Sequence, residues 1–342
     1  MTALELDGSY GEGGGQILRT ALALSLYLTR PVRLFNLRAR RDRPGLRPQH
    51  LACVKAAAEI SRAKVQGASV GSQELYFAPG PVHPGCYAFD IGTAGSTTLL
   101  FQTLLFPLLF AKAPSQLTLS GGTHNPKAPP FDFLAQAFLP LLARMGAKVN
   151  LKLKRPGFYP RGGGVLQAEI EPLPSLAPLE LTERGKVLNI FACAQVAGLA
   201  RHIAERELKV LALSLGLQDL RVESLTSCGI GNVVTVTVQC EHITEVFSGF
   251  GERGVPAETV AERLASEVKE YLDAGVPVGP YLADQLLLPL ALAGGGKFLT
   301  TPPTLHTTTC CWVIEQFLPL SFKLTQQDAR RFWIQVTNNA RS

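Results

Sequence analysis

The sequence lacks the features of disulfide-stabilised, zinc-binding and membrane-spanning proteins. Its seven cysteines are scattered and include no C-x-x-C pair, which argues against a disulfide framework and against a structural zinc site. The longest apolar run, residues 99–111, is too short for a bilayer and is interrupted by Gln102 and Pro107. The N-terminus has neither the basic nor the apolar region of a signal peptide. We therefore expect a soluble, cytoplasmic protein in a reducing compartment, with no membrane partner.

Charged residues are also scarce, at 18% of the 342 residues, whereas 46% are hydrophobic. This composition argues against a disordered chain and predicts a well-packed globular protein that is long enough for two domains. The net charge of +6 is a moderate basic bias, compatible with a polyanionic partner. Five arginines gather in residues 38–47, RARRDRPGLR. Because guanidinium groups make bidentate contacts with phosphates, this segment is a candidate phosphate-binding loop, and a solvated surface loop is the alternative.

Glycine is plentiful, and three glycines are consecutive within residues 8–19, GSYGEGGGQILR. The stretch lies between an apolar run and residues at helical spacing, which predicts a strand, an exposed turn and a helix start. Such a turn presents bare N–H groups to an anion, but no Lys-Ser/Thr pair follows, so it is not a P-loop. A tight packing turn is the alternative. Glu12, Gln16 and Arg19 favour a binding site, because their spacing lets them share one helix face.

A recurring order of elements predicts an α/β fold with three repeated βαβαββ units. The first unit follows the glycine turn, the second begins near Tyr87, and the third opens with a helix at Gly279. A small α/β domain without a recognisable chemical motif is inserted before the third unit, and we expect it to extend the surface or stabilise the fold. The predicted division assigns units one and two to residues 1–181, the insert to 182–276, and unit three to 277–342. Units one to three form the main catalytic domain.

Three further residues are candidates for chemistry. His306 lies at the start of the third unit's second helix, on the side where the units gather their polar loops, although a lone histidine there is usually a cap or a packed core residue. Tyr281 and Asp284 lie three residues apart at another helix start. They offer an aromatic face for an adenine ring and a carboxylate that could orient a ribose or the imidazole. A carboxylate favoured by the helix dipole is the alternative for Asp284.

Several long motifs, in the same order along nearly the whole chain, resemble the RNA 3′-terminal phosphate cyclase family. The motifs are GEGGGQILR at 11–19, RAR…RPGLRPQH at 38–50, SGGTHNPKAPP at 120–130, GGG at 162–164, GPYLADQLLLPLALAG at 279–294, and the His306 helix. The resemblance implies three βαβαββ units with a small α/β domain inserted before the third.

The resemblance further implies an ATP-dependent enzyme that converts an RNA 3′-terminal phosphate to a 2′,3′-cyclic phosphate. The reaction passes through a covalent histidine–AMP adduct and an adenylylated RNA 3′ end, with ATP as co-substrate and a divalent metal, Mg²⁺ or Mn²⁺. By position, His306 is the nucleophile and Glu12 the metal-binding residue. The positions assigned to the phosphates of ATP and RNA are Gln16, Arg19, Arg38, Arg41 and Gln49. The positions assigned to ATP are Gln102, Pro129, Phe133, Tyr281, Asp284 and Gln285.

The chain departs from the family pattern at Cys310, four residues after His306, where asparagine is common. A polar role at that position is therefore not carried over to this chain. Two other functions are considered: a non-catalytic RNA-binding ribosome-assembly factor of the same fold, and an enolpyruvyl-type transferase built from similar units. His306 together with Glu12 and Arg19 favours the cyclase. No pattern in the sequence indicates an oligomeric state.

Overall fold

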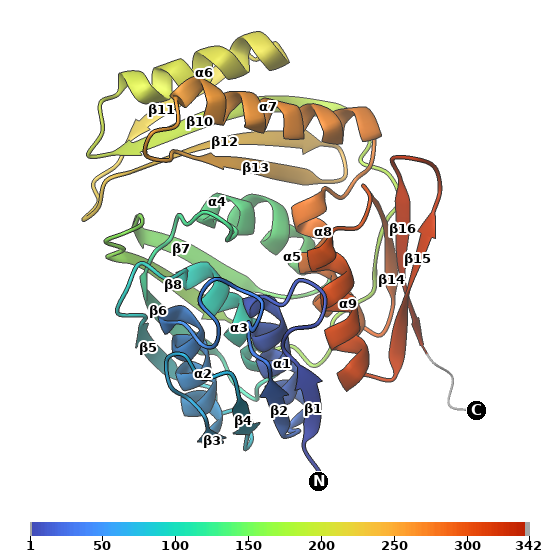
Figure 1. Ribbon diagram of the computed structural model, residues 1–342. Helices are drawn as coiled ribbons and strands as arrows, with labels where there is room; N and C mark the ends of the chain where they lie inside the picture. Colours follow the sequence, from blue (N-terminus) through green and yellow to red (C-terminus); the bar gives the residue numbers. More distant parts are fainter. Residues whose placement is uncertain (1, 339–342) are drawn as a thin grey trace.

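The first four-stranded sheet positions the glycine-rich turn. A computed structural model describes residues 2–338, and this sheet is labelled in it (Figure 1). The strand order is β1-β2-β4-β3, with β1 and β2 parallel and the other pairs antiparallel. Helix α1 is buried along most of its length, because its leucines and alanines cover nearly its whole circumference. The elements are β1 (Leu4–Asp7), α1 (Gly15–Leu28), β2 (Val32–Phe35), α2 (Pro48–Ser61), β3 (Lys64–Gln66) and β4 (Leu75–Ala78).

The second sheet repeats this strand order and these strand directions, as β5-β6-β8-β7. The helical segment at residues 131–144 is divided by a π-helical turn. Pro140 explains the division, since it has no N–H to continue an α-helical ladder. The elements are β5 (Cys86–Asp90), α3 (Thr97–Leu109), β6 (Ser115–Gly121), α4 (Phe131–Phe133), η1 (Leu134–Phe138), α5 (Leu139–Arg144), β7 (Val149–Arg155) and β8 (Gly164–Ile170).

The third sheet has the order β9-β14-β16-β15 and takes its first strand from ahead of the insert. β9 pairs in parallel with β14, so the range 1–181 holds a strand of the third sheet in addition to units one and two. This strand was not predicted, because three residues that follow a proline-rich segment carry no periodic signal. The elements are β9 (Leu179–Leu181), α8 (Pro280–Leu292), β14 (Gly296–Thr300), α9 (Leu305–Phe317), β15 (Leu320–Gln326) and β16 (Phe332–Asn338).

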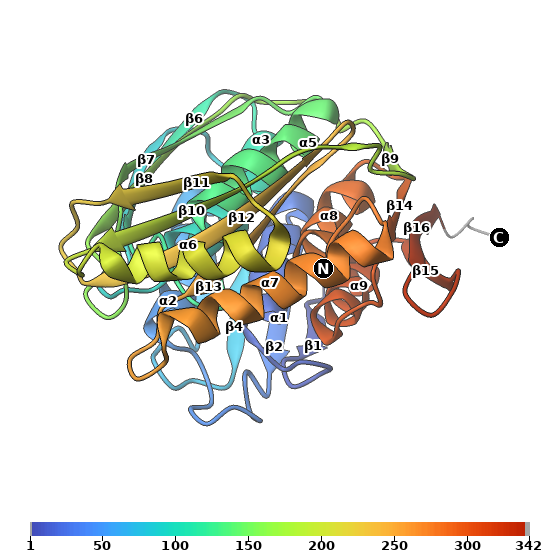
Figure 2. The same ribbon diagram turned by 90° about the horizontal axis from the view of Figure 1, so that it is seen from above.

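The segment between β9 and α8 forms a fourth sheet, ordered β11-β10-β12-β13, with two long helices. Viewed from above, α6 and α7 lie across one face of this sheet (Figure 2). At its lower edge β13 contacts α4 and η1 of the second unit (Figure 1). The predicted mixed α/β class is confirmed, whereas the domain limits at 182 and 276 stay a prediction. The elements are β10 (Val187–Ala197), α6 (His202–Leu215), β11 (Asp219–Ser224), β12 (Gly231–Cys240), β13 (Thr244–Phe250) and α7 (Ala257–Ala274).

Helices that accompany the first, second and third sheets meet at the centre of the molecule. Helix α1 contacts both α3 and α9, and α8 contacts α9 (Figure 1). Residues far apart in the sequence are thereby brought to one place, which holds the candidate site. Within residues 2–338, none of the helices combines the length and the apolar character needed to cross a membrane.

A buried carboxylate fastens the insert to α8. The Glu245 side chain lies on β13 and is 2% exposed. Its Oε1 accepts a hydrogen bond of 2.5 Å from the N–H of Gly279, the residue that precedes α8. Burial raises the pKa of Glu245 to about 8, although the backbone N–H groups of Gly279 and Val246 oppose this shift. Glu245 therefore holds its proton near neutral pH in the folded protein.

Glu245→Gln should become more stable relative to the wild type as the pH rises. A glutamate in the unfolded chain ionises near pH 4.3, so the free energy of unfolding of the wild type falls between that pH and about 8. The glutamine cannot ionise and keeps an oxygen for Gly279, and the gain should reach at most about 1.4 kcal/mol per pH unit. Urea unfolding across this pH range measures the difference. The control Glu262→Gln, at an exposed position, should show no pH-dependent difference from the wild type. If the difference in free energy of unfolding between Glu245→Gln and the wild type does not change with pH, Glu245 is not protonated in the folded protein.

Candidate active site at the junction of α1, α8 and α9

The glycine-rich turn lets the start of α1 approach α9 closely. Gly11 and Gly13 have φ values of 52° and 60°, in the left-handed region that favours glycine. The Glu12 N–H donates to Thr309 Oγ1 at 3.0 Å. A Cβ at Gly11 would overlap with the same hydroxyl. Glycine is therefore required at position 11 for two reasons: the backbone conformation there favours glycine, and α9 leaves no room for a side chain.

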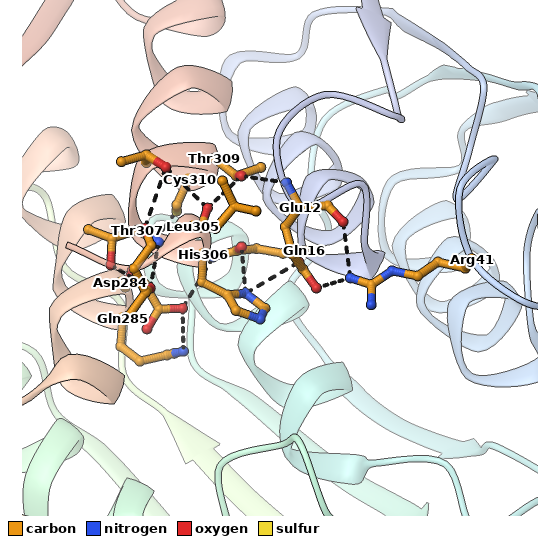
Figure 3. Close-up of polar contacts among 12 residues, drawn as sticks. Glu12, Gln16, Arg41, Asp284, Gln285, Leu305, His306, Thr307, Thr309 and Cys310 are labelled. Carbon is orange, nitrogen blue, oxygen red and sulfur yellow. Dashed lines mark hydrogen bonds and ion pairs between the residues drawn. The ribbon is translucent and has the colours of Figure 1, made fainter. Parts of the chain in front are cut away.

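His306 lies in the first turn of α9 and meets two side chains from the glycine-rich segment (Figure 3). Its Nδ1 lies 3.0 Å from Gln16 Oε1 and 3.4 Å from Glu12 Oε2. The Gln16 amide nitrogen donates to Asp284 Oδ2 at 3.2 Å. Because this bond turns the amide NH₂ toward Asp284, the Gln16 oxygen faces the imidazole. His306 Nδ1 is therefore the protonated nitrogen, and Nε2 keeps its lone pair.

The surroundings of His306 favour its neutral form. Burial lowers the pKa of His306, and the positive charges of Arg19 and Arg41 lower it further, while Glu12 opposes the shift. The side chain nevertheless stays 54% exposed, so a ligand can reach it. A neutral, accessible imidazole with a free Nε2 lone pair is suited to nucleophilic attack.

The predicted phosphate-binding residues do not all gather at His306. Arg41 forms an ion pair with Glu12 Oε1 and also donates to the Glu12 carbonyl at 3.1 Å. The charge of Arg19 acts on both His306 and Asp284, and burial lowers the pKa of Arg19 itself. The Arg38 guanidinium instead donates to the carbonyls of Gly45 at 3.1 Å and Arg43 at 3.2 Å, and so supports its own loop.

Gln49 lies in the first turn of α2, against the turn that precedes α3. A Cβ at Gly95 would lie 2.8 Å from Gln49 Cβ. The next residue, His50, is buried, and its Nδ1 accepts from the Arg47 N–H at 3.1 Å. Burial and the neighbouring arginines lower the pKa of His50 to about 3, so it caps α2 as a neutral group. The RPQH motif contains this histidine, but nothing in the motif indicates its capping role.

A cavity of about 500 Å³ opens beside His306. Its wall is largely apolar toward the loop before α4, mixed toward α3, and carries polar side chains toward α1 and α8. All six residues that the sequence analysis assigns to ATP line this cavity, as do Gln16, Arg19 and His306: the six are Gln102, Pro129, Phe133, Tyr281, Asp284 and Gln285. Neither Arg38 nor Gln49 is among the lining residues.

The polar floor of the cavity is formed by α8. Burial raises the pKa of Asp284 to about 7, against the opposing effects of its own backbone N–H, Arg19 and Gln285. Gln285 accepts a hydrogen bond from the Gln102 amide and donates to Asp284 at 3.5 Å. The Cys310 thiol lies 3.9 Å from the Asp284 carbonyl, and burial raises its pKa to about 12. Cys310 is therefore a neutral thiol that packs beneath the site.

The insert contributes to the cavity wall, which the sequence analysis did not foresee. Val246, Ser248 and Phe250 of β13 line the cavity, followed by Glu252. We expected the insert only to extend the surface or stabilise the fold, and that expectation was too narrow. The alternation of residues 246, 248 and 250 shows that they share one face of a strand. Which face meets the cavity depends on the packing of β13 against α4, which has no signature in the sequence.

Glu12 is the residue best suited to a divalent metal. Its Oε2 is buried and has no hydrogen-bond partner among residues 2–338, although it faces His306. The described chain holds no group of three His, Cys, Asp or Glu side chains arranged for a metal ion. One carboxylate fits a Mg²⁺-type ion whose remaining ligands are substrate phosphates and water. The donor set is thus compatible with a metal that arrives with a nucleotide.

A family model and two similar proteins point to one family. The family model described as RNA 3′-terminal phosphate cyclase matches residues 10–324. Proteins named RNA 3′-terminal phosphate cyclase are 50% identical over 96% of this chain and 93% of their own length in Koribacter versatilis, and 51% identical over 97% of both chains in Ralstonia nicotianae. The crystal structure of the enolpyruvyl transferase NikO from Streptomyces tendae matches with a TM-score of 0.35 and 11% identity. That match covers 98% of this chain but 48% of the other.

Gly11→Ala should destabilise the protein and reduce any activity that depends on His306. The alanine must adopt a left-handed conformation, at a cost of about 1–2 kcal/mol, and its methyl group must also push Thr309 away. Gly216→Ala is a matched control, because Gly216 has a φ of 68° but open space around a Cβ. We expect Gly11→Ala to lose about 1–3 kcal/mol more than this control in urea unfolding. Equal losses would show that the contact with Thr309 is unimportant.

Proposed function

Because the chain belongs to the RNA 3′-terminal phosphate cyclase family, we propose that it converts an RNA 3′-terminal phosphate to a 2′,3′-cyclic phosphate at the expense of ATP. The observation that carries this proposal is the hydrogen-bonded series from Asp284 through Gln16 to His306 at the edge of the cavity (Figure 3). This arrangement prepares one imidazole nitrogen for attack beside a space of nucleotide size.

ATP occupies the cavity with its adenosine toward the apolar wall. The cavity volume of about 500 Å³ lies within the range usual for small-molecule sites. Phe133 and Pro129 supply apolar surface, and the half-exposed Tyr281 ring supplies an aromatic face. Asp284 and Gln285 supply acceptors and donors for the ribose or the base. The triphosphate then extends toward Arg19 and His306, where positive charge and the start of α9 favour anions.

In the first step, His306 Nε2 attacks the α-phosphorus of ATP. A bond forms between Nε2 and phosphorus, the bond from phosphorus to the bridging oxygen of the β-phosphate breaks, and pyrophosphate leaves. Gln16 holds the proton on Nδ1 through its oxygen, and Asp284 fixes the Gln16 amide. Arg19 and Arg41 favour the developing negative charge. The product is a histidine–AMP adduct.

In the later steps, an oxygen of the RNA 3′-phosphate attacks the same phosphorus and releases His306. The RNA then ends in a diphosphate linkage to adenosine. Its own 2′-hydroxyl attacks the RNA phosphorus, loses its proton, and expels AMP. A 3′-phosphate dianion is a poor electrophile, whereas AMP is a good leaving group for a hydroxyl held beside it.

A divalent metal, Mg²⁺ or Mn²⁺, would be held by Glu12 together with phosphate oxygens of ATP. It would neutralise charge on the phosphates when bound. Arg41 and His306, which contact Glu12, fix the position of this carboxylate.

His306→Ala should fold normally but form no covalent adduct. Incubation with α-labelled ATP and Mg²⁺ should leave label on the denatured wild type, and acid should release it, as expected of a phosphorus–nitrogen bond. His202→Ala is the control, because this exposed histidine lies at the start of α6, outside the site. Undiminished labelling of His306→Ala would remove His306 from the mechanism.

An oligonucleotide that ends in 2′-deoxyribose 3′-phosphate should stop at the AMP-capped stage. It has no hydroxyl to close the ring, so the capped strand should accumulate and migrate as one nucleotide longer. A ribose-ended strand of the same sequence should proceed to the cyclic phosphate. If His306 is adenylylated and the ribose-ended strand is cyclised, yet no capped deoxy strand forms, transfer of AMP to RNA is not on the pathway.

A further inference from the structure

An exposed aromatic pair lies next to the candidate active site and has no role in the chemistry above. The rings of Tyr10 and Trp312 stack, with centroids 4.0 Å apart and planes inclined by 17°. Trp312 is partly buried and packs against the core, whereas Tyr10 is 46% exposed. Tyr10 is thus the outer member of the pair. Leu305, on the same helix as Trp312, is also 58% exposed.

The position of this pair is fixed by the same contacts that build the site. Tyr10 precedes Glu12 by two residues, on the turn that the Glu12–Thr309 hydrogen bond fastens to α9. Trp312 follows His306 by six residues, which corresponds to about 9 Å along the helix axis. Trp312 therefore lies between one and two helical turns further along α9 than His306, on a different face of that helix.

The charges around the turn favour a polyanion. Arg41 holds Glu12 from one side, and Arg40 lies close enough to Asp7 to lower the pKa of that carboxyl. Both arginines belong to the segment 38–47, which carries five arginines. An aromatic ring exposed beside a basic loop is the combination that binds single-stranded nucleic acid, because bases stack on the ring and phosphates pair with the cations.

We propose that Tyr10 stacks on the base of the 3′-terminal nucleotide of the RNA, with Trp312 supporting it from beneath. This inference rests on the proposed cyclase function and names a residue that positions the RNA end. Stacking on an aromatic ring is available to every base, so it holds the terminal nucleotide without selecting its sequence. The terminal ribose and its phosphate then lie toward His306.

Tyr10→Ala should raise the KM for a 3′-phosphorylated RNA roughly tenfold, in the range that loss of one stacked base produces. Rates are normalised to the fraction of enzyme that self-adenylylates. A variant or wild type that forms no adduct then counts against the proposed cyclase function, not against the role of Tyr10. Tyr10→Phe should restore the KM, because the ring is enough. Tyr27→Ala is the matched control: Tyr27 also contacts a second ring, Phe110, but lies at the far end of α1.

A substrate whose 3′-terminal nucleotide lacks its base tests the partner of Tyr10 directly. With this RNA, wild type and Tyr10→Ala should have equal KM values. A persistent tenfold difference would show that Tyr10 acts on the fold rather than on the base. If equality arises only when the penultimate base is missing, the assignment to the terminal nucleotide is wrong.

Tryptophan fluorescence gives a second readout that needs no turnover. The chain has two tryptophans, so Trp333→Phe leaves Trp312 as the sole emitter. Adding 3′-phosphorylated RNA without ATP should change its emission, and the strand without a terminal base should change it much less. Equal responses to both strands, or none to either, would overturn the proposal even if the enzyme cyclises RNA.

Discussion

The candidate site depends on the close approach of α1 and α9. Glu12 donates its N–H to Thr309, a residue 297 positions away in the chain, and Gln16 reaches His306 from the same helix start. Gly11 permits this approach because any larger residue would displace Thr309. Without this close approach, His306 would lose Gln16, which fixes its tautomer, and the Glu12 carboxylate beside it. The surroundings of the proposed nucleophile are thus formed by a contact between residues 12–16 and residues 306–309, which lie far apart in the sequence.

The charges at this contact are arranged so that several groups remain close to neutral. Burial lowers the pKa of His306 and of Arg19, and raises that of Asp284 to about 7. An isolated buried charge would cost several kcal/mol, and the positive charge of Arg19 offsets part of that cost for Asp284, whereas the nearby Glu12 opposes the ionisation of Asp284. The site therefore offers a neutral imidazole together with positive charge for phosphates. Cys310 adds no charge to this balance, since its thiol stays protonated.

Much of the fold and of the cavity could be predicted from sequence, because long periodic segments and long motifs carry strong signals. The mixed α/β class is confirmed, and the six positions assigned to ATP line one cavity, although their roles stay predictions. Short or purely tertiary features were missed. β9 has three residues, the π-helical turn arises from one proline, and the contribution of β13 depends on how the insert packs. The assignment of Arg38 to phosphates stays a prediction, and the support that its guanidinium gives to its own loop had no signature in the sequence.

The place of β9 ahead of the insert also determines when the protein can finish folding during synthesis. β9 must wait for β14, which leaves the ribosome only after the whole intervening domain has been made. That domain has its own sheet and helices and can form first, while closure of such a long loop is entropically slow. Helices α8 and α9, which carry Asp284 and His306, also emerge after that domain, and only β15 and β16 follow them among the elements of residues 2–338. A nascent or truncated chain therefore exposes one wall of the cavity without His306, and the proposed site is complete only when the final sheet has formed.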